Sequence, residues 1–152
     1  MKTRGKNSFL DRRSIASELS AIEARKPASR KVLSKLFSQD SFKKSICFTG
    51  PAGVGKSTLI SHLLSYCAET SKDPRIAWLA CDPSSVLSGG SVLGDRIRLV
   101  GRELPESVFV RSLSTRSTQA FSPALRDMEV YLEKEFDEVW VETTHDVVHS
   151  RA

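Results

Sequence analysis

Residues 50–57 of the chain read Gly-Pro-Ala-Gly-Val-Gly-Lys-Ser, and this run matches the pattern G-x-x-x-x-G-K-[ST] at every fixed position. Glycines allow the backbone to curl so that successive N–H groups point at phosphate oxygens. A helix that follows such a loop offers its positive dipole end to the same anion. The pattern predicts a phosphate-binding loop, in which Lys56 faces the β- and γ-phosphates and the Ser57 hydroxyl joins a magnesium shell. The predicted phosphate-binding residues are Gly50, Pro51, Ala52, Gly53, Val54, Gly55, Lys56, Ser57 and Thr58.

The segments on either side of the loop supply the context that the motif needs. Ser45 to Thr49 is a short apolar run typical of a buried strand. Lys56 to about Thr70 has the spacing of an amphipathic helix. The apolar residues expected to face inward from this helix are Leu59, Leu63 and Leu64. The alternative is a glycine-rich turn with a surface lysine, but a strand before the motif and a helix after it favour the phosphate site.

The rest of the chain continues the alternation of strands and helices. Strands are predicted at Ile76–Cys81, Val108–Leu113 and Glu138–Glu142, and a helix is predicted over residues 122–135. Such alternation indicates an α/β fold with a mostly parallel sheet. The length of 152 residues fits one domain.

The first 44 residues are predicted to form a basic helical extension, followed by a nucleotide-binding domain over residues 45–152. The extension holds twelve basic and four acidic residues, whereas the remainder has a net charge of −3. Asp11 is a plausible N-cap for a helix that ends or is interrupted near Pro27, and a second amphipathic stretch follows. Basic arms can bind nucleic acid, but this one has no series of aromatic residues for base stacking. A solvated helix face is the preferred interpretation, and no nucleic-acid partner is expected.

Carboxylates that follow apolar strands are the candidate magnesium ligands. Asp82 and Glu142 each end a predicted strand, and the carboxyl edge of a parallel sheet is where ligands bind. The alternatives are an Asp-Pro turn for Asp82 and an exposed strand end for Glu142. Asp95 lies in a glycine-rich loop, and its spacing alone leaves its role open.

Composition excludes several other classes. No apolar run approaches the roughly 20 residues that a membrane span requires, and the N-terminus has no apolar signal region. The cysteines Cys47, Cys67 and Cys81 show no metal-binding spacing, so they are expected to be buried thiols in a reducing cytoplasm.

Four segments resemble the GTPases that chaperone methylmalonyl-CoA mutase, the MeaB/ArgK group. They are the N-terminal helix from Asp11 to Glu23, the loop at residues 49–59, the run at residues 82–98, and Val141-Glu142-Thr143. The run at 82–98, which contains Asp-Pro-Ser-Ser and Gly-Gly-Ser-Val-Leu-Gly-Asp-Arg, is especially distinctive. The resemblance covers roughly residues 11–144.

The resemblance implies a SIMIBI-type P-loop GTPase that binds GTP and Mg²⁺ and gates B12 cofactor loading. By resemblance, the catalytic residues are Lys56, Asp95 and Glu142, and the metal residues are Ser57, Asp82, Asp95 and Glu142. The implied partners are GTP or GDP and a B12-dependent acyl-CoA mutase. A homo-oligomer is also implied for the family, although its dimerisation helices are absent here.

Some positions depart from the family pattern. His145 stands where the family has a switch glycine, and Ser117 stands where it has another glycine. The guanine-reading Asn-Lys-x-Asp segment and the later strands are absent, so an incomplete sheet with unpaired edges, marginal stability and weak hydrolysis are expected. Two alternatives stay open: an ATP-dependent small-molecule kinase that uses Arg96, Arg98 and Arg116, and a non-catalytic nucleotide-binding or partner-binding remnant.

Overall fold

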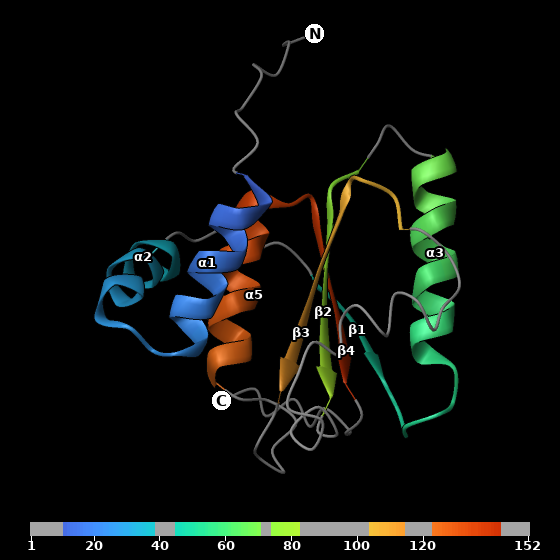
Figure 1. Cartoon of the computed structure of the whole chain (residues 1–152), viewed down its shortest axis with the longest axis horizontal. Helices are drawn as coiled ribbons and strands as arrows, with labels where there is room; N and C mark the ends of the chain where they lie inside the picture. The colour runs from blue at the N-terminus through green and yellow to red at the C-terminus, as the bar shows by residue number, and fades with distance from the viewer. Residues whose placement is uncertain (1–10, 39–44, 71–73, 83–103, 115–122, 144–152) are drawn as a thin grey trace, which may run out of the picture.

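The computed structural model describes residues 11–38, 45–70, 74–82, 104–114 and 123–143. Within these residues four parallel strands form one sheet in the order β1-β4-β2-β3. The strands are β1 (Ser45–Thr49), β2 (Ile76–Asp82), β3 (Val108–Ser114) and β4 (Glu138–Thr143). Their carboxyl ends meet at one edge of the sheet, which lies at the bottom of Figure 1. The predicted α/β class and the predicted parallel sheet are confirmed.

Helices cover both faces of the sheet (Figure 1). On one face lie α1 (Arg12–Glu23), α2 (Pro27–Phe37) and α5 (Pro123–Glu135), and on the other lies α3 (Lys56–Thr70). No helix of the described part of the chain combines the length and the apolar character needed to cross a bilayer.

The sheet separates two apolar clusters because successive side chains of a strand point to opposite faces. The larger cluster joins α1, α2 and α5 to alternate residues of the strands, such as Leu79 and Val141. The smaller cluster joins α3, through Ile60 and Leu64, to both tryptophans of the chain, Trp78 and Trp140. The N-terminal helices therefore share a core with the sheet. The proposed division of the chain at residue 44 stays a prediction.

The ends of the N-terminal helices follow local rules. Asp11 caps α1, because its side chain accepts a hydrogen bond from the Arg13 amide at 3.4 Å. Pro27 is the first residue of α2, a position where its missing N–H costs nothing. The first helix already ends at Glu23, and Arg25 turns the chain with a positive φ of 51°.

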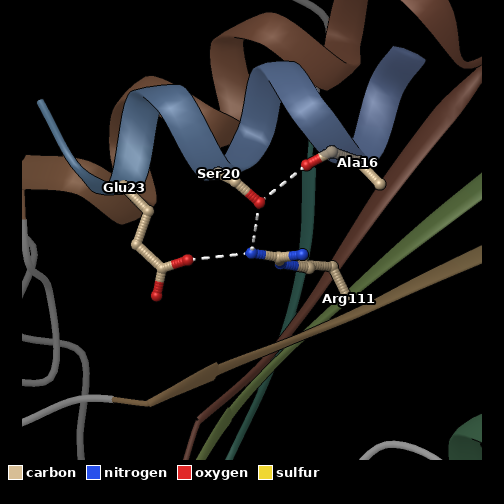
Figure 2. A network of polar contacts seen from close by, with 4 residues as sticks. All are labelled: Ala16, Ser20, Glu23 and Arg111. Atoms are coloured by element: carbon tan, nitrogen blue, oxygen red, sulfur yellow. Dashed lines mark hydrogen bonds and ion pairs between the residues drawn. The ribbon is translucent and has the colours of Figure 1, made fainter. Parts of the chain in front are cut away.

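A polar network ties α1 to β3, as Figure 2 shows. Arg111 of β3 donates to the Ser20 hydroxyl at 3.1 Å and to the Glu23 carboxylate at 2.9 Å. Ser20 in turn donates to the Ala16 carbonyl at 2.9 Å. Arg12 of the same helix donates to the carbonyls of Glu106 and Val108. The network holds the beginning of the chain against a strand that is about ninety residues away in the sequence.

Two expectations about burial were wrong. Leu59 was expected to face inward, but its side chain is 53% exposed, and α3 contacts the sheet mainly through Ile60 and Leu64. Cys47 was expected to be buried, but it is exposed because β1 is an edge strand. Cys81 is buried as expected, and Cys67 is intermediate.

Candidate functional site

The loop between β1 and α3 has the backbone shape that its glycines were predicted to provide. Gly50, Gly53 and Gly55 have φ angles of 146°, 80° and 91°. Residues with a side chain rarely adopt such angles. A Cβ added at Gly53 or Gly55 would meet nothing within 4 Å, so conformation rather than crowding requires glycine at these two positions.

The side chain of Lys56 folds back onto the first residues of this loop. Its ammonium group donates to the Gly50 carbonyl at 2.8 Å and to the Pro51 carbonyl at 2.7 Å. Charged donors make the stronger kind of hydrogen bond. The cation therefore lies next to the loop that was predicted to enclose an anion.

The start of α3 adds backbone donors to the same place. The Leu59 amide donates to the Gly55 carbonyl at 2.9 Å, which makes this the first turn of the helix. The earliest N–H groups of a helix have no carbonyl partner within the helix. The loop residues 51–55 are exposed, so these donors lie at the surface of the protein rather than inside the core.

Ser57 and Glu142 meet at the carboxyl edge of the sheet. The Ser57 hydroxyl donates to Oε1 of Glu142 at 2.5 Å, across 85 residues of sequence. Glu142 is only 5% exposed, and its Oε2 atom is buried without a hydrogen-bond partner. The fold therefore brings together two residues that were each predicted as metal ligands, and their metal roles stay predictions.

The strand order explains how Glu142 reaches the loop. β4 lies between β1 and β2, and Glu142 is in register with Phe48 on one side and Ala80 on the other. Phe48 is two residues before the loop begins, so the carboxylate lies beside the start of the loop. This neighbourhood depends on a strand order that sequence proximity does not reveal.

The other predicted site residues are placed less completely. Asp82 is the last residue of β2, in register with Ser114, at the same edge of the sheet as Glu142. The metal role predicted for Asp82 stays a prediction. Asp95 lies outside the described residues, as do His145 and Ser117, so their predicted roles stay predictions.

The described oxygen atoms suit a magnesium ion. Magnesium prefers oxygen ligands and keeps several of its waters. The Ser57 hydroxyl and the carboxylate that it contacts offer such ligands beside the loop. Within the described ranges no group of three or more His, Cys, Asp and Glu side chains gathers.

Sequence reasoning did not single out Ser112 or Trp78. Both have a buried polar side-chain atom without a hydrogen-bond partner, as Glu142 does. The period of two along β2 and β3 could have placed them on the face that α3 covers. The alternation of side chains does not predict that these polar atoms are buried, because their burial depends on how the sheet packs against other elements.

Parallel strands whose carboxyl edge carries such a loop are the architecture of P-loop NTPases. The fold matches the crystal structure of an LAO/AO transport system kinase with a TM-score of 0.57, over 90% of this chain and 40% of that one, at 23% identity. The P-loop NTPase fold predicted from the sequence is thereby confirmed.

The chain belongs to the MeaB family, whose model is described as methylmalonyl-CoA mutase-associated GTPase and matches residues 15–147. A protein named as a GTPase from Pyrococcus abyssi is 32% identical over 139 residues, which cover 88% of this chain and 41% of that relative. Another from Mycobacterium tuberculosis is 32% identical with the same coverage. The fused isobutyryl-CoA mutase of Cupriavidus metallidurans is 37% identical over 139 residues, or 12% of its length. The chain thus spans about two fifths of the length of the two GTPase-named relatives.

Proposed function

We propose that the chain binds GTP together with Mg²⁺ at the loop of residues 50–58. The observation that carries this proposal is the 2.5 Å hydrogen bond from Ser57 to Glu142 beside the glycine loop. It joins the residue that would contact the metal to the carboxylate that would hold the metal's waters. Membership in a family described as GTPases supports guanine as the base.

The residues of the site would act mainly by positioning and by neutralising charge, as phosphoryl transfer requires. The loop amides would bind the phosphate oxygens. Lys56 would exchange its two carbonyl partners, Gly50 and Pro51, for the β- and γ-phosphates. Magnesium, when bound, would neutralise the phosphates and polarise the reacting oxygens. Asp82 and Asp95 are proposed to complete the metal and switch region with Ser57 and Glu142.

We further propose that the chain hydrolyses GTP and that this hydrolysis is coupled to a mutase. Two relatives are themselves fused isobutyryl-CoA mutases, from Geobacillus kaustophilus and Cupriavidus metallidurans. This fusion supports a B12-dependent acyl-CoA mutase as the partner of the chain, with GTP turnover gating cofactor loading. The shared segment is a small part of those proteins, 9% and 12% of their lengths.

Titration of the purified chain with GTP and with ATP, each with and without Mg²⁺, tests the proposal. We expect GTP to bind more tightly with Mg²⁺ than without it and more tightly than ATP. Lys56→Ala should weaken triphosphate binding at least tenfold, or about 1.4 kcal/mol. The matched control is Lys35→Ala, which removes a surface lysine from α2. Unchanged GTP affinity in Lys56→Ala would overturn the phosphate site, and tighter binding of ATP would overturn the choice of guanine.

A further inference from the structure

The face of the sheet that α3 covers carries two cross-strand rows of side chains. The row farther from the phosphate loop is made of Val110, Trp78, Trp140 and Ile46. The row nearer the phosphate loop is made of Ser112, Ala80, Glu142 and Phe48. Trp78, Ala80 and Trp140 pack in the cluster that contains Ile60 and Leu64 of α3. Residues in register on neighbouring strands share a face, so Ser112 and Glu142 lie on this face too.

Three buried polar atoms gather in these rows without a hydrogen-bond partner. They are Nε1 of Trp78, Oγ of Ser112 and Oε2 of Glu142. The described residues contain one further atom of this kind, Nε of Arg111, which lies on the opposite face with α1. Buried polar groups in folded proteins nearly always have a partner, which can be ordered water. Each of the three atoms therefore needs a partner that is not part of the chain, and their common face allows one partner to serve them.

The three groups are chemically complementary but too far apart to bond to one another. The indole N–H can only donate, the carboxylate can only accept, and the hydroxyl can do both. Ser112 and Glu142 flank Ala80 on its two neighbouring strands, so their Cα atoms are separated by roughly 10 Å. A chain of two waters with hydrogen bonds of about 2.8 Å each spans most of that separation. Ala80, with only a methyl group, separates the two polar side chains.

We infer that ordered water binds over Ala80 and joins the Ser112 hydroxyl and the Trp78 indole to the free oxygen of Glu142. Water is the ligand because it both donates and accepts, as this set of groups requires. Ser57 occupies the other oxygen of Glu142, so the water would fix the carboxylate from the opposite side. Ser112 and Ala80 are then positioning residues for the proposed magnesium site, and this second step rests on the proposed function. Partners that orient a metal's ligands typically change metal affinity by about 10- to 100-fold when they are removed.

The water itself is tested in the nucleotide-free full chain by NMR. Nuclear Overhauser contacts between water and the two indole N–H groups are measured on ¹⁵N-labelled protein, and Trp140→Phe assigns the two signals. We expect a long-lived water contact at Trp78. Trp140 is the internal control, because its indole already donates to Glu138 at 2.9 Å. Absence of a water contact at Trp78 would overturn the inference, whatever the chain binds.

Substitutions at Ala80 test where the water lies. Ala80→Val places two methyl groups over the backbone and should abolish the contact at Trp78, whereas Ala80→Gly should keep it. A contact that persists in a folded Ala80→Val protein would contradict the placement. If that variant fails to fold, Ser112→Ala serves instead, since it removes one anchor and should weaken the contact measurably. An undiminished contact in Ser112→Ala would contradict the placement in the same way.

The positioning role is tested by the magnesium dependence of GTP affinity. Ser112→Ala should lower the gain in affinity that Mg²⁺ provides by about tenfold and leave affinity without Mg²⁺ unchanged. Ser112→Thr, which restores a hydroxyl, should recover most of the gain. An unaltered magnesium dependence in Ser112→Ala would overturn the positioning role. A wild-type chain that binds no GTP would instead refute the proposed function. The water contact at Trp78 would still decide whether ordered water binds over Ala80.

Discussion

At the scale of single residues, the contact between Ser57 and Glu142 involves a carboxylate that lowers the stability of the fold but serves the proposed magnesium site. Burial of this carboxylate disfavours the folded state, because the charged group leaves bulk water and the chain supplies a hydrogen-bond partner to only one of its oxygens. The same carboxylate is what a hydrated magnesium ion would use at the proposed site. Residues that a site requires are often unfavourable for the stability of the empty protein.

Glu142→Gln separates these two effects. The variant keeps an oxygen that can accept from Ser57 but removes the charge. We expect the free energy of unfolding without Mg²⁺ to rise by about 1 kcal/mol, while the gain in GTP affinity from Mg²⁺ falls at least tenfold. Urea unfolding and GTP titration measure the two quantities, with Glu69→Gln, an exposed change on α3, as control. A less stable variant with normal magnesium dependence would show that the carboxylate is structural.

At the scale of elements, α1 is held to β3 by Arg111 rather than by apolar contact alone. The guanidinium group contacts Glu23 at 2.9 Å, with side-chain exposures of 24% and 37%. Partial exposure reduces the contribution of such an ion pair to stability. The same guanidinium group also donates a hydrogen bond to the Ser20 hydroxyl. The bond joins elements far apart in the sequence, so its loss should loosen α1 selectively.

Arg111→Ala should lower the free energy of unfolding by about 1 kcal/mol and speed hydrogen exchange at the amides of α1. The matched control is Arg126→Ala, which removes an ion pair that lies within α5. Its loss should cost less and leave exchange in α1 unchanged. Equal effects of the two substitutions on α1 would show that the network in Figure 2 does not anchor the helix.

Tyr131 makes the helical layer sensitive to alkaline pH. Burial, followed by the nearby charges of Glu135 and Glu18, raises the pKa of Tyr131 to about 12 from its ordinary value of 10.0. The unfolded chain ionises first, so the folded state is favoured fully below pH 10 and loses that advantage as the pH rises towards 12. Over this window wild type should lose about 2–3 kcal/mol relative to Tyr131→Phe, which has no such group. Unfolding curves of the two proteins at matched pH measure the difference, and parallel pH profiles would contradict it.

At the scale of the whole molecule, β1 leaves one edge of the sheet unpaired within the described residues. Ile46 on this strand is 43% exposed, and Leu59 and Tyr66 of the neighbouring helix are 53% and 62% exposed. Apolar side chains beside an open strand edge favour association with another chain. Ile46→Lys should therefore weaken self-association at least tenfold, or by about 1.4 kcal/mol.

Sedimentation velocity over a concentration series measures that association. Phe37→Lys is the matched control, because Phe37 has the same 43% exposure but lies on α2, away from the edge. Association that responds equally to both substitutions would contradict a role for the β1 edge. A wild type that stays monomeric throughout the series would contradict it as well.

The sequence by itself determined the fold class, the shape of the loop and the position of Glu142, which depend on local pattern. Alternation of strands and helices predicted the parallel α/β fold. The positions of Gly50, Gly53 and Gly55 predicted a loop of unusual backbone angles, and the apolar run before Glu142 placed that residue at a strand end. Each follows from interactions between near neighbours in the chain, where backbone conformation and side-chain period are set.

Only the tertiary structure decided which strands lie side by side and which are at the edge. Leu59 and Cys47 have the apolar character of core residues, yet both are exposed. Cys47 lies on the edge strand β1, and α3 packs on the sheet through Ile60 and Leu64 rather than through Leu59. The meeting of Ser57 with Glu142, and the row that Glu142 shares with Ala80 and Ser112, likewise arise from strand order. The physical reason is that strand order is set by packing among segments distant in the sequence, and no local pattern records it.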